Sequence, residues 1–309
     1  MKIDVKFYKK TVDRLVNVLY NWLQSRKNVV GNMLIIAVSL CKKIKLLLDL
    51  SNLPRRVNMP RFFVRKHQIE NGIVTILGDD AHHISRSLRM AAGEKITVCD
   101  MQKYEYECVL SEFFSDRVLA QVVSNRKCDT EPPFVAHLFQ ALPKGDKLDI
   151  VIQKAVECGV SEVTTFNSER CIAKEKGDEE TKLRRRNKIS LEAAKQSGRG
   201  LVPEVKATVS FAKMLEEASK SDIKLFCYEG DETVSMRRFL SLESARLKSE
   251  GIENPSISVI VGSEGGFSLH EVEKAREAGF TPVGLGKRIL RTETAPLFVL
   301  SCLCYELEL

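Results

Sequence analysis

Two glycine-containing turns near the C-terminus have the residue types of a binding site for a small ligand. The first turn, Gly262 to Gly266, follows an apolar strand and has three glycines in five residues. Its backbone can therefore adopt positive φ angles and come close to a ligand. Ser268 and Glu271 have the spacing of a capping box, which predicts a helix that holds the turn in place. A lone glycine-rich turn is a weak indication, because structural turns also use glycine.

The second turn begins at Gly284 and Gly286 and continues as the polar run Leu290-Arg291-Thr292-Glu293-Thr294. An almost wholly apolar helix follows, so the charged side chains have little structural reason to lie there. Both turns follow strands of one predicted sheet, and ligands bind beyond the carboxyl ends of such strands. We therefore expect the two turns to form one pocket. The chain contains neither Gly-x-x-x-x-Gly-Lys-Ser/Thr nor Gly-x-Gly-x-x-Gly, the usual nucleotide loops.

A third group of candidate residues is basic. Between Lys182 and Arg199, seven Lys and Arg stand against a single Glu. Such a run is usually a solvated helix surface, but its density favours contact with phosphates. The turns 142–147 and 169–170 add polar groups at the same predicted sheet edge, although each alone is more often structural.

Charge and cysteine usage limit the class of protein. Residues 1–58 hold 12 Lys and Arg against 3 Asp, whereas the remainder holds 36 Lys and Arg against 38 Asp and Glu. The net charge of +7 therefore does not by itself indicate nucleic-acid binding. Nine cysteines without a Cys-x-x-Cys pair predict free thiols in a reducing cytosol and no metal site. The apolar run 29–41 is shorter than the roughly 20 residues that a membrane span needs.

The elements that would position these residues follow an alternating pattern. We expect strands at 135–142, 162–166, 224–228, 258–261 and 282–285. We expect helices at 147–158, 179–197, 211–219, 233–249, 269–278 and 295–307. This alternation predicts an α/β domain with a mostly parallel sheet covered on both faces.

Residues 59–131 have a different pattern of short strands, expected at 73–77, 95–100, 104–113 and 117–124, which favours a small barrel. A helix is expected from Asp79 or Asp80 through Met90. This helix, and an entry strand that precedes residue 73, carry basic side chains. The entry strand has Arg61, Arg65 and Lys66, and the helix has His82, His83, Arg86 and Arg89. They predict either a phosphate-binding face or a solvated face with a core histidine.

Residues 1–58 form a basic helical extension, with amphipathic helices expected at 11–24 and 33–50. Three interpretations are open: a targeting or membrane-surface segment, an accessory appendage, or sequence translated from a start codon upstream of the true one. The last two are favoured, because Met59 begins a self-contained pattern.

From Met59 to Leu309 the chain resembles the ribosomal RNA small subunit methyltransferase E family, of the SPOUT class of knotted methyltransferases. No part of residues 1–58 matches. Ser263 and Lys287 depart from the family pattern, which more often has proline at both positions. The matching stretches are Met59 to Phe63, His82 to Arg89, Lys144 to Lys147, Gln153-Lys154, Glu157 to Val160, Glu169-Arg170, Glu192 to Arg199, the Gly262 turn and Leu290 to Thr294.

The resemblance implies a PUA-like barrel at 59–131 and a methyltransferase domain at 132–309 with a C-terminal trefoil knot. It also implies a homodimer that uses S-adenosylmethionine to methylate uridine N3 in 16S ribosomal RNA. The cofactor residues would be Gly262, Glu264, Gly265, Gly266, Leu285, Gly286, Ile289, Leu290 and Thr294. The RNA contacts would be Arg61, Arg65, Arg86, Arg89, Gln196, Ser197 and Arg199.

A cation beside the uracil would stabilise the anion that forms when N3 loses its proton. We expect Arg291 or Arg199 to supply this catalytic charge, and Glu293 to orient Arg291 rather than act as the base. Two alternatives stay open. One is a non-catalytic RNA-binding or ribosome-assembly protein with the same fold, and the other is a methyltransferase for a different RNA base.

Overall fold

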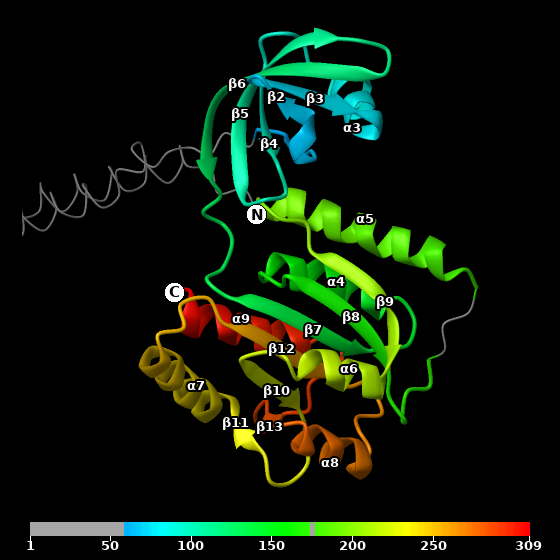
Figure 1. Ribbon diagram of the computed structural model, residues 1–309. Coiled ribbons are helices and arrows are strands. Elements are labelled where there is room, and N and C mark those ends of the chain that lie inside the picture. Colours follow the sequence, from blue (N-terminus) through cyan, green and yellow to red (C-terminus); the bar gives the residue numbers. More distant parts are fainter. Residues whose placement is uncertain (1–58, 174–176) are drawn as a thin grey trace, which may run out of the picture. The chain divides into compact units, whose positions relative to one another are not determined.

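The computed structural model describes residues 59–173 and 177–309, and Met59–Leu309 forms one compact unit (Figure 1). The helices expected at 11–24 and 33–50 lie outside the described residues. None of the described helices is long and apolar enough to cross a membrane.

The first part of the unit is a six-stranded sheet in the order β1-β4-β5-β6-β3-β2. All neighbouring strands are antiparallel except β1 and β4. Alternate apolar residues of these strands form the core of this part, for example Val74, Ile76, Ile96 and Val98, all at most 1% exposed. The strands are β1 (Arg61–Phe63), β2 (Ile69–Glu70), β3 (Ile73–Leu77), β4 (Lys95–Cys99), β5 (Tyr104–Phe113) and β6 (Arg117–Lys127).

The helix expected from Asp79 or Asp80 through Met90 is shorter than predicted. It begins as α3 (Gly78–His82) and widens into a π-helical turn at His83–Ser87, where the Leu88 amide donates to the His83 carbonyl. Arg89 then adopts a φ of 52°, in the left-handed region. A non-glycine residue is rare there and ends the helix.

The second part is a seven-stranded sheet in the order β11-β13-β10-β12-β7-β8-β9, with every neighbouring pair parallel. The predicted α/β domain with a parallel sheet is therefore confirmed. Its strands are β7 (Val135–Ala141), β8 (Glu162–Asn167), β9 (Glu204–Ser210), β10 (Ile223–Cys227), β11 (Val234–Ser235), β12 (Ser256–Val261) and β13 (Thr281–Gly284).

Helices cover both faces of this sheet, as predicted (Figure 1). One face packs against α4 (Lys147–Glu157), α5 (Glu179–Ser197), α7 (Met236–Glu250) and α9 (Ala295–Leu307). The other packs against α6 (Phe211–Ala218) and α8 (Leu269–Glu277). Successive strand residues alternate between the two cores, for example Leu225 and Phe226, because strand side chains point to opposite faces.

The entry strand expected near Arg61 is present as β1, but three short or polar strands were not expected from the sequence: β2, β9 and β11. Strand β9 lies at an edge of its sheet and only Val205 is buried, so it lacks the apolar run that marks the inner strands. The trefoil knot and the domain boundary near residue 131 stay predictions.

Candidate functional site

Three neighbouring parallel strands deliver their following loops to one edge of the sheet. Strand β10 lies between β12 and β13, with Phe226 opposite Ile260 and Cys227 opposite Val283. The carboxyl ends of parallel strands meet at the same edge, which is where ligands bind in such folds. The glycine turn after β12 and the polar loop after β13 are therefore neighbours, as the sequence predicts.

A chain of hydrogen bonds joins these two loops directly. The Thr292 hydroxyl donates to the Gly262 carbonyl at 2.7 Å. The Gln140 side-chain amide, at the end of β7, donates to the Thr292 hydroxyl at 3.0 Å and to the same Gly262 carbonyl at 3.3 Å. Gln140 is fully buried and Thr292 is 5% exposed, so the bonds fix the separation of the two loops away from solvent.

The glycine turn is too tight to accept side chains. A Cβ atom on Gly265 would lie 2.7 Å from the Arg170 carbonyl oxygen, and one on Gly262 would lie 3.0 Å from the Phe267 ring. Gly266 has a φ of +63° and lies close to the Glu229 carboxylate, which a Cβ on Gly266 would meet at 3.8 Å. The absence of side chains thus lets neighbouring groups approach the turn.

The predicted capping box at Ser268 and Glu271 is confirmed. The Ser268 hydroxyl accepts from the Glu271 amide at 3.2 Å, and the Glu271 carboxylate accepts from the Ser268 amide at 2.9 Å. Glu271 is 1% exposed and its other oxygen accepts from the Glu169 amide at 2.9 Å. The same carboxylate therefore anchors both the start of α8 and the segment that packs on Gly265.

A small ion-pair network crosses the front of the site. The Lys147 amine lies 2.7 Å from Glu264 and 3.6 Å from Glu293. Burial opposes ionisation of Glu264, but hydrogen bonds from Lys147 and from the Lys144 backbone outweigh it and lower the pKa of the Glu264 carboxyl. The hydrogen bond to Glu264 raises the pKa of the Lys147 amine. Both groups are therefore charged at neutral pH.

The expected contact between Glu293 and Arg291 is wrong, because Glu293 pairs with Lys147 instead. Arg291 is exposed, and within residues 59–173 and 177–309 its guanidinium has no hydrogen-bond or ion-pair partner. Its charge is thus available to a ligand at the mouth of the site.

Buried polar atoms without protein partners test whether the site suits a polar ligand. Within the described residues, Gln140 Oε1, Ser168 Oγ, Ser263 Oγ and Glu293 Oε2 are buried and make no hydrogen bond, but Glu293 Oε2 has Lys147 as an ion-pair partner at 3.6 Å. Gln140 and Ser263 belong to the converging segments, and Ser168 directly follows β8. Buried polar groups without partners are costly and rare in folded proteins. The set fits a ligand with several donor groups and a positive charge, as S-adenosylmethionine has.

The remaining predicted cofactor residues lie on the loop after β13. Leu285 and Leu290 are half-buried against the core, and Gly286 has a φ of +114°. Ile289 is 84% exposed, and Thr294 is exposed at the start of α9. The structure places these residues on one loop, and their contact with a cofactor stays a prediction.

The predicted RNA-binding residues divide into two groups. Arg65, Arg86, Arg89 and Gln196 are exposed, so their side chains can reach a polyanion. Ser197 is half-buried and donates its hydroxyl to the Ala193 carbonyl at 2.7 Å.

Arg61 and Arg199 require a correction. Arg199 is 3% exposed and forms an ion pair with Glu131 at 2.6 Å. It also donates to the carbonyls of Val156 and Val160. Arg61 donates to Glu105 at 2.7 Å and to the Arg199 carbonyl at 3.2 Å. A buried guanidinium needs such partners, so both arginines stabilise the contact between the six-stranded sheet and the parallel-sheet domain.

Sequence reasoning missed Gln140, Lys147, Glu229, Ser263 and Thr292 as members of the site. Gln140 carries a usable signal, because it is a polar residue near the end of an otherwise apolar strand. Such a buried polar group needs specific partners. Lys147 and Thr292 lie in motifs that the sequence singles out, but only the fold reveals which atoms they contact.

Comparison with known proteins agrees with this arrangement. The RNA methyltransferase domain family matches residues 130–304, and the RNA methyltransferase PUA domain family matches residues 76–121. The fold and the site thus define the class of PUA-containing RNA methyltransferases.

More specific relatives carry one name, ribosomal RNA small subunit methyltransferase E. The protein of that name from Bacillus subtilis is 35% identical over 81% of this chain and 98% of its own length. The one from Mesomycoplasma hyopneumoniae is 34% identical over 79% of this chain and 98% of its own. A crystal structure from Neisseria gonorrhoeae, bound to S-adenosyl methionine, has a TM-score of 0.65 and 31% identity, and covers 80% of this chain and 97% of that one. The chain belongs to the ribosomal RNA small subunit methyltransferase E family.

Proposed function

We propose that this protein transfers a methyl group from S-adenosylmethionine to N3 of a uridine in 16S ribosomal RNA. The observation that carries the proposal is the hydrogen-bonded junction of Gln140, Gly262 and Thr292, which brings two loops together at the carboxyl edge of the sheet. The names of the relatives supply methyl transfer and small-subunit ribosomal RNA, and the family resemblance supplies uridine N3.

Cofactor binding is assigned to both loops. The residues that would hold the cofactor are Gly262, Glu264, Gly265 and Gly266, with Leu285, Gly286, Ile289, Leu290 and Thr294. The buried oxygens of Gln140 and Ser263 add hydrogen-bonding capacity that no described residue satisfies. When bound, S-adenosylmethionine supplies a methyl group that its sulfonium already activates.

The chain's own contribution to the reaction is positioning and charge. Arg291 is the proposed catalytic residue, because its exposed guanidinium has no partner in the described part of the chain. Placed beside O2 or O4 of the uracil, it would stabilise the negative charge that develops as N3 loses its proton. The hydrogen bonds of Thr292 and Gln140 would hold the backbone next to Arg291 in place. This matters because a small displacement of reacting groups greatly lowers the rate of a transfer reaction.

RNA binding is assigned to the exposed basic residues of the PUA-like part, Arg65, Arg86 and Arg89, and to Gln196 at the end of α5. Such side chains position a nucleic acid through its phosphates.

A homodimer in the cytoplasm completes the proposal. Helix α9 leaves Phe298 39% exposed and Tyr305 75% exposed on a largely apolar element. Exposed apolar side chains of this kind suit a surface that a second copy covers. Helix α9 is therefore the proposed contact between the two copies.

The test is to incubate the purified full-length protein with labelled S-adenosylmethionine and small ribosomal subunits or rRNA from a strain lacking this gene. We expect one mole of methyl per mole of RNA, found by mass spectrometry as N3-methyluridine. Label at another base atom would support a different methyltransferase. Cofactor binding without transfer to either substrate would support a non-catalytic RNA-binding protein and overturn the proposal.

A further inference from the structure

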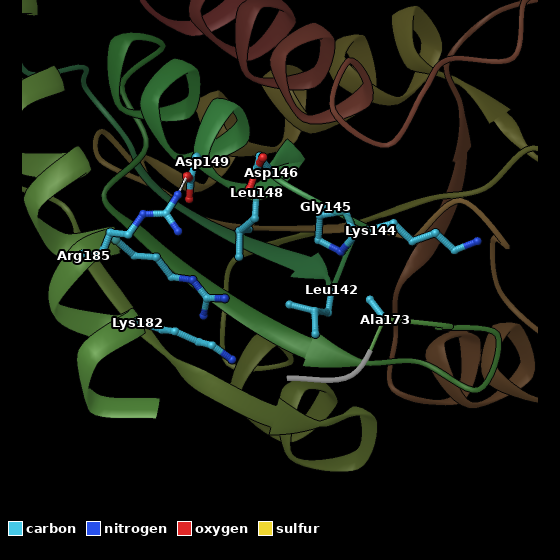
Figure 2. A pocket seen from close by; sticks show the side chains of 11 residues that line it. Leu142, Lys144, Gly145, Asp146, Leu148, Asp149, Ala173, Lys182 and Arg185 are labelled. Carbon is cyan, nitrogen blue, oxygen red and sulfur yellow. Dashed lines mark hydrogen bonds and ion pairs between the residues drawn. The ribbon is translucent and has the colours of Figure 1, made fainter. Parts of the chain in front are cut away.

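A cavity of about 350 Å³ lies against the turn that joins β7 to α4 (Figure 2). This volume is at the lower end of small-molecule pockets, so it suits a single nucleotide unit better than a large cofactor. The walls come from the turn after β7, the first residues of α4 and the first half of α5.

The α5 wall is strongly basic. Lys182, Arg185 and Arg186 line it, and Figure 2 shows the labelled Lys182 and Arg185 reaching from α5 toward the turn. Arg185 forms an ion pair with Asp149. Lys182 is half-buried and makes no side-chain hydrogen bond or ion pair within the described residues, although the nearby Asp178 carboxylate, which caps α5, interacts with its charge. A half-buried cation of this kind favours an anionic ligand.

The turn contributes backbone rather than charge. Helix α4 begins at Lys147, and the side chain of its N-cap residue, Asp146, makes no capping hydrogen bond. The Asp149 amide donates to the Asp146 carbonyl at 3.2 Å, whereas the Lys147 and Leu148 amides have no acceptor among the described residues and remain as donors beside the basic wall. The Asp146 carboxylate opposes this charge, whereas Lys144 extends away from α5 in Figure 2.

The same turn contacts the candidate cofactor loops. The Lys144 amide donates to Glu264 at 3.2 Å, and the Lys147 amine lies 2.7 Å from the same carboxylate. One turn of five residues thus borders the basic cavity and also contacts the glycine turn after β12. An RNA strand that delivers a base to the loops would have its backbone within reach of the cavity.

We propose that this cavity binds one backbone phosphate of the RNA next to the nucleotide that is methylated, with Lys182 as the principal contact. The proposal rests on the proposed function and names the part of the RNA that the parallel-sheet domain holds. Guanidinium and ammonium groups together suit a phosphate, because both donate several charge-assisted hydrogen bonds. Lys182 is a positioning and binding residue here, not a catalytic one.

The test compares Lys182→Gln with Lys188→Gln in the full-length chain. Both changes remove one charge from α5, but Lys188 is exposed and does not line the cavity. We expect Lys182→Gln to raise the KM for RNA about tenfold, the usual effect of losing one hydrogen bond to a charged group. It should also reduce the slope of log affinity against log salt by about one. Lys188→Gln should leave the KM within about twofold, and the Kd for S-adenosylmethionine should not change in either variant.

A second measurement identifies the phosphate itself. RNA substrates would carry a neutral methylphosphonate at each position, one at a time, on either side of the methylated uridine. One substitution should weaken binding to the wild-type protein and have no further effect with Lys182→Gln, as expected for direct partners. If wild-type protein methylates RNA while Lys182→Gln behaves like Lys188→Gln, the proposal is overturned and the proposed function stands. If wild-type protein transfers no methyl group, the proposed function itself fails.

Discussion

Among single residues, Arg291 is the one proposed to stabilise the negative charge that develops on the uracil. Its guanidinium has no partner in the described chain, although it lies one residue from the hydrogen bond that joins the two loops. We expect Arg291→Ala to lower kcat about 100-fold to 1,000-fold, the usual loss when one donor to a developing anion is removed. Quench-flow or steady-state assays with saturating RNA would measure this loss.

Arg288→Ala is the matched control, because Arg288 is an exposed arginine of the same loop. It should retain turnover within about threefold. Equal turnover of Arg291→Ala and wild-type protein would remove the electrostatic role from Arg291.

The sequence alone cannot separate Arg291 from Arg199, since both are arginines in polar motifs. The difference depends on partners that the fold supplies. Glu131, 68 positions away in the sequence, forms an ion pair with Arg199 and neutralises its charge. Glu293 forms an ion pair with Lys147 and none with Arg291. Buried Gln140 was missed for the same reason, because its partners come from two distant loops.

At the level of secondary-structure elements, the glycine turn after β12 should lose its conformation when a single methyl group is added to Gly265. A Cβ on Gly265 meets the Arg170 carbonyl oxygen at 2.7 Å, so the backbone must move. We expect Gly265→Ala to lower turnover about 100-fold, as misplacement of about 1 Å does in alignment reactions. Gly251→Ala is the control, because Gly251 ends α7 with a φ of +69° in open space. It should destabilise the fold by about 1 kcal/mol without changing cofactor affinity.

The contact between the two sheets yields a separate prediction. Removing one partner of a buried ion pair usually costs about 3–5 kcal/mol, so Arg199→Ala should lower the free energy of unfolding by that amount. Glu131→Ala should cost a similar amount, and the double variant should cost much less than the sum. Urea unfolding followed by circular dichroism measures these values. Normal stability of Arg199→Ala, together with lost turnover at low temperature, would return Arg199 to the catalytic site.

Long, periodic elements were predicted well, and irregular ones were not. Helix α5 has its predicted bounds because Asp178 caps its first turn and Gly198 ends it in the left-handed region. The helix after β3 was predicted too long, because Arg89 takes a positive φ that no residue pattern signals. Edge strands such as β11, with two residues, are too short to show a period.

At the scale of the whole molecule, the described unit Met59–Leu309 contains both sheets and every residue of the candidate site. We therefore expect a protein that begins at Met59 to keep the turnover of the full chain within about twofold per folded molecule, because both family matches, at residues 76–121 and 130–304, fall in this part of the chain. Methyl-transfer assays on both forms would measure it. A truncated protein that is folded but inactive would assign residues 1–58 to the activity.

The loops after β12 and β13 are proposed to bind S-adenosylmethionine. Calorimetric titration of the full-length protein with S-adenosylmethionine measures this binding. We expect one site per chain with a Kd in the range of roughly 1 μM to 1 mM that is typical of enzyme substrates, and much weaker binding to Gly265→Ala. Absence of binding to the wild-type protein, or equal binding to Gly265→Ala, would contradict it.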